Sequence, residues 1–248
     1  MAILYGFHVV EQALKAVRPL ERILVVRGRS GRRLAELLAA ARGREVPIRF
    51  VSREEADRLA GTRAHQGVLA VSGAKAYIDL EELLRSARQP ALFVLLDGVE
   101  DPHNLGAIVR TAYCAGADGL ILPARRAVGV TAAVAKASAG AVEHLPIARV
   151  TNLVRAMARL KQNGCWLIGL DERAPLTFTE VDLSLPCGLV FGGEGRGLHQ
   201  LVREKCDFLA SIPTYGAITS LNVSVAAAVV LYEAVRQRRS KGLLPPRP

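Results

Sequence analysis

The chain has 248 residues, half of them hydrophobic, so it can bury a sizeable core in one large domain or two small ones, and extensive disorder is excluded. Its 33 lysines and arginines outnumber 23 aspartates and glutamates, and the net charge of +10 favours an anionic partner. Only six of the basic residues are lysines. Because arginine binds phosphate with two hydrogen bonds and stacks on bases, this composition favours RNA, although a biased genomic base composition also replaces lysine with arginine.

Cysteine spacing and the first residues bear on the cellular compartment. The cysteines form no Cys-x-x-Cys pair and have no histidine at zinc-ligand spacing; they are Cys114, Cys165, Cys187 and Cys206. We therefore expect buried thiols in a reducing compartment and no metal. The amino-terminal segment contains no basic leader and is interrupted by Gly6, His8 and Glu11, and no run of 18 apolar residues occurs in the chain. We expect neither a signal peptide nor a membrane span, and hence a cytoplasmic protein.

The front of the chain alternates short helix and strand patterns. Helices are predicted at residues 7–17 and 32–42, and strands at residues 21–26, 47–51 and 67–71. This pattern predicts a small N-terminal α/β domain at residues 1–72. The more polar segment at residues 73–89 contains a short charged helix and ends before Pro90, which is typical of a linker.

Residues 90–248 contain apolar strands separated by helix-like stretches. The predicted strands are residues 91–99, 119–123, 165–170, 188–192 and 208–213. Nearly continuous apolar strands indicate a parallel, Rossmann-like sheet with both faces covered. Ligands of such sheets bind beyond the carboxyl ends of the strands, and three polar motifs follow predicted strands here.

The first motif, DPHNLGAIVRT, occupies residues 101–111. Apolar residues follow Asn104 at helical spacing; they are Leu105, Ile108, Val109 and Ala112. Asn104 is therefore predicted to be a helix N-cap. At about 100° per residue Arg110 lies roughly 140° from the apolar stripe and leans toward the helix start, so it can share a cleft with Asn104. An ordinary cap and a solvated arginine are the alternative interpretation.

The second motif, GLVFGGEGRGL, occupies residues 188–198 and follows a buried strand. Gly193, Gly195 and Gly197 alternate, which does not give the Gly-x-Gly-x-x-Gly of dinucleotide sites, and no Lys-Ser or Lys-Thr follows, as a phosphate loop requires. The glycines still allow a ligand to approach the backbone, with Glu194 held among exposed amides. A flexible turn with a solvated glutamate is the alternative.

The third motif spans residues 212–239, from a strand through a glycine-containing loop into a helix that is apolar nearly all round between Val223 and Leu231. Such a helix is buried on every side. Because a sheet covers only one side, we expect a second subunit on the other, and hence a homodimer. Ser220 and Asn222 stand at the helix start, where they either cap it or donate to a substrate. The basic end of the chain is more typical of a solvated tail than of an RNA contact.

Together, in this order, the three motifs resemble those of the SpoU/TrmH family of RNA ribose 2′-O-methyltransferases, over residues 90 to about 238. YGFHVVEQAL at residues 5–14 and HQGVLA at residues 65–70 are similar to the family's small RNA-binding domain. The resemblance implies an α/β protein with a trefoil-knotted, Rossmann-like parallel sheet (SPOUT) and a small N-terminal α/β RNA-binding domain. The knot follows from the resemblance alone, because general rules of chain connection make knots rare. The two-domain layout is most similar to bacterial members that methylate a guanosine ribose in 23S rRNA.

The resemblance also implies the cofactor, the partners and the site. The cofactor is S-adenosyl-L-methionine (AdoMet), and the partners are 23S rRNA or the assembling large subunit and a second copy of the chain, bound through the knotted domain. The implied catalytic residues are Asn104, Arg110, Glu194, Ser220 and Asn222. The implied AdoMet-binding residues are Gly192, Gly193, Ile212 and Leu221. Thr214 and Tyr215 replace a methionine and a small residue that are common in the family, which leaves the lining of the adenosine pocket open.

The implied reaction transfers a methyl group in line from a sulfonium to a ribose hydroxyl that loses its proton, without a metal or a covalent intermediate. We expect Arg110 to bind the substrate phosphate and assist deprotonation, with Asn104 and Ser220 orienting the substrate. Because arginine side chains stay protonated in proteins, an oriented phosphate or water is the alternative proton acceptor. Glu194 and Asn222 are expected to fix loops and substrate.

Isolated histidines and sparse aromatics have structural roles more often than catalytic ones. The histidines weighed as bases are His8, His65, His103 and His144. His65 could contact RNA, and Tyr5, Phe7 and Tyr77 could stack on bases, with core packing as the alternative.

Three other functions stay open at this stage. A tRNA ribose 2′-O-methyltransferase of the same family would share the motifs but usually lacks the front domain. A noncatalytic RNA-binding protein would have no need of Arg110 and Asn104. A dinucleotide enzyme ranks last, because the early glycine fingerprint is missing.

Overall fold

The computed structural model describes residues 2–16, 18–73 and 75–244. By packing, the chain divides into two compact units, which are considered separately below. One comprises Met1–Ala76 with Val130–His144, and the other comprises Tyr77–Gly129 with Leu145–Pro248. The bounds of the N-terminal domain, linker and catalytic domain given above stay a prediction.

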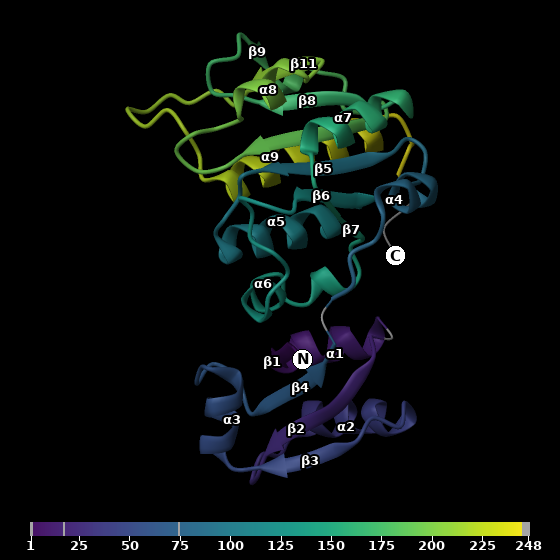
Figure 1. Cartoon of the computed structure of the whole chain (residues 1–248), viewed down its shortest axis with the longest axis vertical. Coiled ribbons are helices and arrows are strands. Elements are labelled where there is room, and N and C mark those ends of the chain that lie inside the picture. Colours follow the sequence, from purple (N-terminus) through teal and green to yellow (C-terminus); the bar gives the residue numbers. More distant parts are fainter. Residues whose placement is uncertain (1, 17, 74, 245–248) are drawn as a thin grey trace. The chain divides into compact units, whose positions relative to one another are not determined.

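The first unit is built on a four-stranded sheet in the order β1-β4-β2-β3 (Figure 1). Its strands are β1 (Ala2–Tyr5), β2 (Leu20–Val26), β3 (Ile48–Val51) and β4 (Val68–Ser72). Its helices are α1 (Phe7–Lys15), α2 (Arg32–Gly43), α3 (Arg53–Ala60) and α6 (Ala132–Ala137), with a short 3-10 helix, η1 (Ala141–Glu143). The strands β2 and β3 are parallel, whereas β4 is antiparallel to both of its neighbours.

The sequence patterns missed β1 and α3 in this unit. β1 has only four residues, too few to show an alternation. The α3 segment, REEADRLA, is mostly polar and buries only Ala56. It is nevertheless well capped, since the Ser52 side chain accepts a hydrogen bond from the Glu55 N–H and Gly61 ends the helix in the left-handed conformation.

The second unit contains a seven-stranded, wholly parallel sheet in the order β7-β6-β5-β10-β8-β11-β9. Its strands are β5 (Leu92–Asp97), β6 (Gly119–Pro123), β7 (Ile147–Val150), β8 (Trp166–Leu170), β9 (Leu176–Thr177), β10 (Cys187–Gly192) and β11 (Phe208–Ser211). This confirms the predicted α/β parallel sheet. The short strands β7 and β9 were missed.

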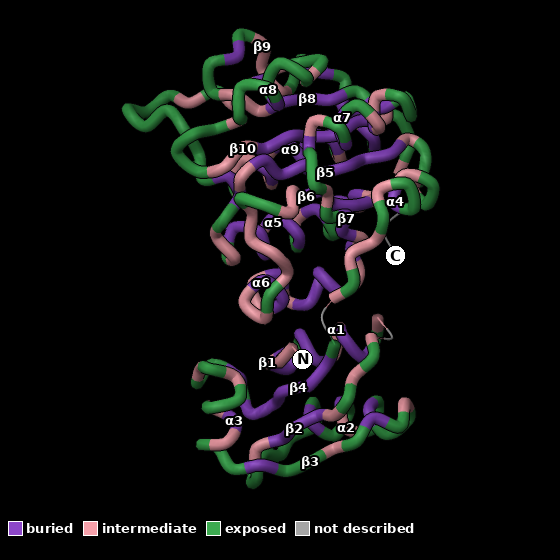
Figure 2. The backbone as a smooth tube through the Cα atoms, viewed as in Figure 1, coloured by how far each residue is buried: buried purple, intermediate pink, exposed green. Residues whose placement is uncertain are grey.

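Helices cover both faces of this sheet, as the buried strands required. α4 (Leu80–Ser86), α7 (Leu153–Gln162) and α8 (Gln200–Glu204) pack on one face, where Leu83, Leu160 and Val202 share a core with Phe93 and Leu167. α5 (Pro102–Cys114) and α9 (Val223–Ser240) contact each other and cover the other face (Figure 1). The central strands are buried along their length, whereas the loops beyond β10 and β11 are exposed (Figure 2). The loops therefore offer the accessible polar groups.

The prediction of four buried thiols was wrong for two of them. Cys165 and Cys187 are buried, but Cys206 is only partly buried and Cys114 is exposed, because it lies on the outer side of α5 at the end of the helix. All four are free thiols. Within the described residues, no helix combines the length and the hydrophobicity that crossing a membrane would require.

The raised pKa values of two of these thiols predict that the folded protein becomes less stable in alkali. Burial raises the pKa of Cys187 to about 11 and that of Cys206 to about 12, whereas a free thiol ionises near pH 9.0. As the pH rises past 9.0, the unfolded chain loses these protons before the folded chain does, so the contribution of the two thiols to the free energy of unfolding is constant below that pH and falls above it. We expect Tm to drop above about pH 9 and the double variant Cys187→Ala/Cys206→Ala to show a shallower decline. An identical pH dependence in both proteins would contradict this.

Candidate active site

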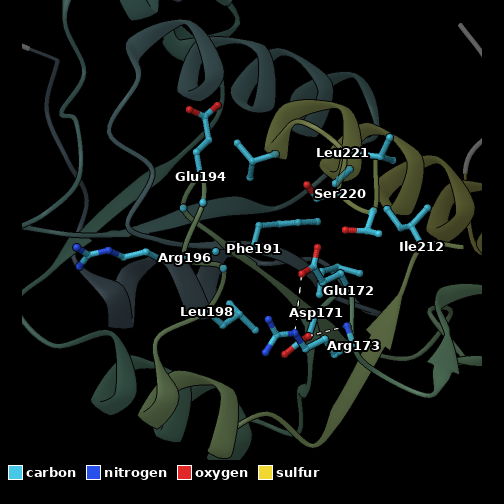
Figure 3. Close-up of a pocket in the computed structure, with 18 of the residues that line it drawn as sticks. Asp171, Glu172, Arg173, Phe191, Glu194, Arg196, Leu198, Ile212, Ser220 and Leu221 are labelled. Carbon is cyan, nitrogen blue, oxygen red and sulfur yellow. Dashed lines mark hydrogen bonds and ion pairs between the residues drawn. The ribbon is translucent and has the colours of Figure 1, made fainter. Parts of the chain in front are cut away.

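A cavity of about 840 Å³ opens where neighbouring strands of the parallel sheet end. Its walls come from the residues after β8, from the loop between β10 and α8, and from the segment between β11 and α9. β10, β8 and β11 are adjacent in the sheet, so their carboxyl ends bring these three segments together. This is the position expected for a ligand site in an open parallel sheet. Figure 3 shows Phe191 between Arg196 on one side and Ile212 and Ser220 on the other.

Glycine is required in the second motif for two different structural reasons. A Cβ on Gly192 would overlap the backbone of Gly197, and a Cβ on Gly193 would overlap the carbonyl oxygen of Gly98. Gly195 and Gly197 instead adopt φ angles of +76° and +64°, in the left-handed region that side chains disfavour. The loop therefore folds back onto its own base and onto the end of β5, which gives it a fixed shape.

Asp97, at the carboxyl end of β5, holds both ends of this loop. Its carbonyl oxygen accepts a 2.8 Å hydrogen bond from Gly193 N–H, and its carboxylate accepts one of 2.8 Å from His199 N–H. The His199 ring lies against the same carboxylate, with 2.9 Å between Nδ1 and Oδ1, so Nδ1 carries the proton. The sequence analysis missed both residues, although a buried carboxylate at the end of an apolar strand was a signal for Asp97.

The three polar motifs meet in one hydrogen-bonded cluster. Asn104 Nδ2 donates to Glu194 Oε1. Asn222 Nδ2 donates to Asn104 Oδ1 at 3.1 Å and to Glu194 Oε1 at 3.2 Å. Residues that are 90 and 118 positions apart in the chain are thus joined, and the carboxylate of Glu194 is fixed between two amides.

The helix starts differ in part from the prediction. Asn104 is not the N-cap of α5; Asp101 caps it, accepting hydrogen bonds from His103 N–H at 3.1 Å and Asn104 N–H at 3.2 Å. Pro102 then begins the helix, because its fixed φ suits the first helical position. Asn104 is thereby released to turn its side chain toward Glu194. Asn222 does cap α9, with its Oδ1 accepting from Ser224 N–H at 2.9 Å.

The remaining predicted residues fall into two groups. Six of them line the cavity together with Asn222; they are Gly192, Gly193, Glu194, Ile212, Ser220 and Leu221. The Ser220 hydroxyl has no hydrogen-bond partner among the described residues. Asn104 lies just behind the cavity wall, through its bonds to Glu194 and Asn222. Arg110 lies on the exposed side of α5, outside the lining, and pairs with no group in the described parts of the chain. The sequence analysis expected Arg110 to be able to share a cleft with Asn104, but the structure of the single chain does not bring Arg110 into this cavity.

A charged wall that the sequence analysis also missed closes the cavity beyond β8. Arg203 Nε donates to Asp171 Oδ2 at 2.5 Å, and Arg173 N–H donates to Asp171 Oδ1 at 2.8 Å (Figure 3). Partial burial raises the pKa of Asp171, but these two hydrogen bonds and the positive charges of Arg203 and Arg173 together outweigh burial, and the pKa is lowered overall. Glu172 lines the cavity beside this pair. Because Arg203 pairs with Asp171 and Arg173 with Glu172, the carboxylates and guanidinium groups of this wall balance each other.

Comparison with known proteins assigns the chain to a family. Residues 91–232 match the SpoU rRNA methylase family, and residues 3–78 match the RNA 2′-O ribose methyltransferase substrate-binding family. The chain belongs to the SpoU family. It is 42% identical over 240 residues to the putative TrmH family tRNA/rRNA methyltransferase YacO of Bacillus subtilis, covering 96% of each protein. It is 38% identical to a putative methyltransferase of the same family from Staphylococcus aureus, covering 97% of this chain and 98% of that protein.

Solved structures of the SpoU family extend the match to the fold and the cofactor. The SpoU methyltransferase AviRb from Streptomyces viridochromogenes superimposes with a TM-score of 0.84 at 30% identity, over 97% of this chain and 90% of AviRb. AviRb in complex with AdoMet matches with a TM-score of 0.83, and an AdoMet-bound rRNA methyltransferase from Sinorhizobium meliloti with 0.81 at 25% identity, over 98% of this chain and 88% of that one. The chain is an AdoMet-dependent RNA methyltransferase, which confirms the predicted family and cofactor.

The cavity suits AdoMet in size and in chemistry. Its volume is within the range of about 300–1,000 Å³ that is usual for small-molecule sites. Apolar side chains of Phe191, Ile212 and Leu221 can enclose the adenine ring. The wall of paired carboxylates and guanidinium groups beyond β8 offers both signs of charge to the zwitterionic amino-acid part of the molecule. AdoMet supplies an electrophilic methyl group, so the protein has to position it and exclude water.

The close approach of Gly193 to Gly98 predicts a specific loss of AdoMet binding. In Gly193→Ala the added methyl group displaces the loop from the end of β5, and we expect AdoMet affinity to fall by about tenfold or more, as a misplacement of about 1 Å at a site does. Isothermal titration with AdoMet measures this. Gly216→Ala, in the segment before α9, is the matched control, because a Cβ there meets no atom within 4 Å. Equal affinities of the two variants would contradict the role given to Gly193.

Proposed function

We propose that this chain transfers the methyl group of AdoMet to the 2′-hydroxyl of a guanosine ribose in 23S rRNA. The choice of rRNA rests on one observation, which is how much of this chain each solved structure covers, its front part included. The rRNA methyltransferase from Sinorhizobium meliloti spans 98% of this chain. The Aquifex aeolicus TrmH/SpoU tRNA-modifying enzyme covers 66% of it, with a TM-score of 0.56. A structure described by 2′-OH methylation of C/U34 on tRNA covers 61%, also at 0.56. A substrate-binding domain at residues 1–72, followed by a linker at 73–89 and a catalytic domain at 90–248, accounts for this difference.

In this proposal the cluster of the three motifs orders the active centre. Asn104 and Asn222 immobilise Glu194, which keeps the glycine loop in place against AdoMet. Ser220, which lines the cavity, orients the ribose. Arg110 binds a phosphate of the substrate, and that phosphate or an ordered water takes the hydroxyl proton. Alignment of two bound reactants supplies much of the rate.

We propose a homodimer formed through the catalytic domain. α9 leaves Val225 48% exposed and Tyr232 51% exposed, and these residues are two helical turns apart on one side of the helix. A second copy that covers this side would bury the uncovered part of an apolar helix, as the sequence predicted. The trefoil knot and a cytoplasmic location also stay predictions.

Methyl transfer from radiolabelled AdoMet to rRNA and to tRNA tests the proposal. Both RNAs are isolated from a strain that lacks the gene, and ribose methylation is then mapped. Label at one guanosine ribose of 23S rRNA is the expected result. Label confined to tRNA would overturn the rRNA target and leave the reaction intact, whereas label on a base nitrogen or carbon would overturn the ribose chemistry. Deleting residues 1–72 in the same assay should abolish selection of rRNA.

The second candidate target, tRNA, is favoured by one observation. The curated relatives from Bacillus subtilis and Staphylococcus aureus are named tRNA/rRNA methyltransferases, and they match nearly the whole of this chain. A tRNA target would therefore not require the loss of the front domain. If free 23S rRNA and tRNA both stay unlabelled, the same assay with isolated large-subunit precursors distinguishes a ribonucleoprotein substrate from a noncatalytic protein.

A further inference from the structure

A second, smaller cavity lies in the first unit, at the end of β2. It has a volume of about 270 Å³ and is formed by three segments, the loop after β2, the start of α3, and the loop that precedes β4. Its lining contains arginines and no acidic residue; these arginines are Arg27, Arg29, Arg53 and Arg63. All four are exposed to solvent. The cavity thus presents four positive charges in a space that is large enough for one or two phosphate groups.

These four guanidinium groups are not neutralised by the described residues. None of the four forms an ion pair with a carboxylate in the described parts of the chain. The groove between α1 and α2 differs, because it contains acidic residues that pair with two of its arginines: Arg33 contacts Glu11 at 2.9 Å and Arg32 contacts Glu36 at 2.8 Å. Glu55, near the cavity, is paired with Arg49, outside the lining. Positive charge is therefore concentrated and unbalanced at this cavity.

Backbone hydrogen bonds hold the three segments together beneath the arginines. Arg27 N–H donates to Val51 O at 2.9 Å, and Val26 N–H donates to Gly67 O at 3.0 Å. The Arg29 side chain lies against Gly67, with its guanidinium 5.6 Å from the centre of the Phe7 ring. A guanidinium at this distance from an aromatic ring is held by a cation–π interaction. The cavity is therefore a built feature of the fold.

His65 fixes the loop that carries Arg63. Its side chain is only 2% exposed, Nδ1 accepts a hydrogen bond from Gly67 N–H at 3.0 Å, and Nε2 lies 2.7 Å from Asp57 Oδ1 on α3. Since Nδ1 is an acceptor, Nε2 carries the proton and donates to Asp57. Both ring nitrogens are thus occupied within the domain, and neither is left to bond to RNA. His65 positions Arg63 instead.

We propose that Arg27, Arg29, Arg53 and Arg63 form a binding site for the sugar–phosphate backbone of the substrate RNA. Arginine is suited to this because its planar guanidinium forms paired hydrogen bonds with phosphate oxygens. The inference rests on the proposed function and goes beyond it, since it names the residues of the front domain that hold the substrate. A backbone site makes no demand on base identity, so it adds affinity for RNA of any sequence and leaves selection of the nucleotide to other contacts.

Removing two of the arginines should change the salt dependence of binding by a definite amount. For single-stranded RNA each phosphate contact contributes about 0.7 to the slope of log K against log salt, so Arg27→Gln/Arg63→Gln should lower that slope by about 1.4. At about 0.1 M salt this corresponds to a loss of affinity of about 25-fold. Arg42→Gln/Arg58→Gln is the matched control, because both arginines are exposed on α2 and α3 of the same unit and lie outside the cavity. Arg27→Lys/Arg63→Lys keeps the charges and should keep the slope.

The experiment uses the full-length chain, radiolabelled 23S rRNA transcript and a short oligouridine, at salt concentrations from about 50 to 200 mM. Circular dichroism and AdoMet binding first establish that each variant is folded. Methyl transfer by the wild-type chain is measured in parallel. The expected result is weaker binding of both RNAs by the cavity variant, little change in the control, and unaltered AdoMet affinity in both.

Other outcomes separate this inference from the proposed function. If the wild type methylates 23S rRNA and the cavity variant binds both RNAs like the wild type, the backbone site is overturned and the proposed function stands. The same holds if the cavity and control variants lose affinity equally. If the wild type methylates only tRNA in the assay of the proposed function, the rRNA target is overturned, and selective weakening of oligouridine binding by the cavity variant still supports the site. Absence of any RNA binding by the wild type would overturn both.

Discussion

Arg110→Ala will bind AdoMet like the wild type and transfer methyl groups about a hundredfold or more slowly, as expected for the loss of a group that assists proton transfer. Arg110 is exposed on α5 and has no partner in the described parts of the chain, so its removal breaks no contact there and should leave Tm unchanged. It also lies outside the lining of the AdoMet cavity. The loss should therefore appear in kcat or in the KM for RNA, and not in AdoMet affinity.

Single-turnover methyl transfer, with Tm and AdoMet titration on the same preparation, measures this effect. Arg155→Ala, on the exposed side of α7, is the matched control and should keep the wild-type rate within about twofold. Arg110→Lys retains the charge but not the paired donors, so it should recover only part of the rate. Normal turnover by Arg110→Ala would remove Arg110 from the proposed active centre.

Arg238→Ala will lower the free energy of unfolding by about 3–5 kcal/mol, because several hydrogen bonds from a charged donor, each contributing about 1.5–3 kcal/mol at most, are lost together. Arg238 lies near the end of α9, is 4% exposed, and donates to the carbonyl oxygens of Pro90, Ala91, Leu183 and Leu185 at 2.7–3.1 Å. It thereby ties the end of α9 to the residues that precede β5 and β10. In the alanine variant these buried acceptors lose their donor.

For a protein of this size the loss corresponds to a decrease in Tm of about 10 °C, which calorimetry or thermal circular dichroism measures. Arg239→Ala removes the same charge from the exposed neighbouring position and should change stability by no more than about 0.5 kcal/mol. Arg238→Met, which keeps the apolar stem, should still be destabilised, because the carbonyl acceptors stay unpaired. Similar Tm values for the variants at 238 and 239 would show that the carbonyl contacts contribute little.

The elements that were read correctly from the sequence are those with strong local patterns. β6 begins and ends at the residues predicted from its apolar run. The apolar stripe of α5, which includes Leu105 and Ile108, is buried, as its helical spacing predicted. β1, β7 and β9 have two to four residues and were missed, whereas β3 and β11, also of four residues, were found, so a run this short does not by itself distinguish a strand from a loop. Asn104 was taken for a helix cap because its residue type fits, and only the backbone conformation reveals that Asp101 occupies that position.

The site shows the same division between local and long-range information. The sequence by itself determined the parallel α/β sheet, the polar motifs at the carboxyl ends of its strands and, through their resemblance to the SpoU family, the AdoMet chemistry. These depend on residue type and on near neighbours in the chain. Only the tertiary structure decided that Glu194 lies between Asn104 and Asn222, that Asp97 clamps the glycine loop, and that four arginines around His65 stand without acidic partners. Such contacts join segments tens of residues apart, and strand order, which no local pattern encodes, brings those segments together.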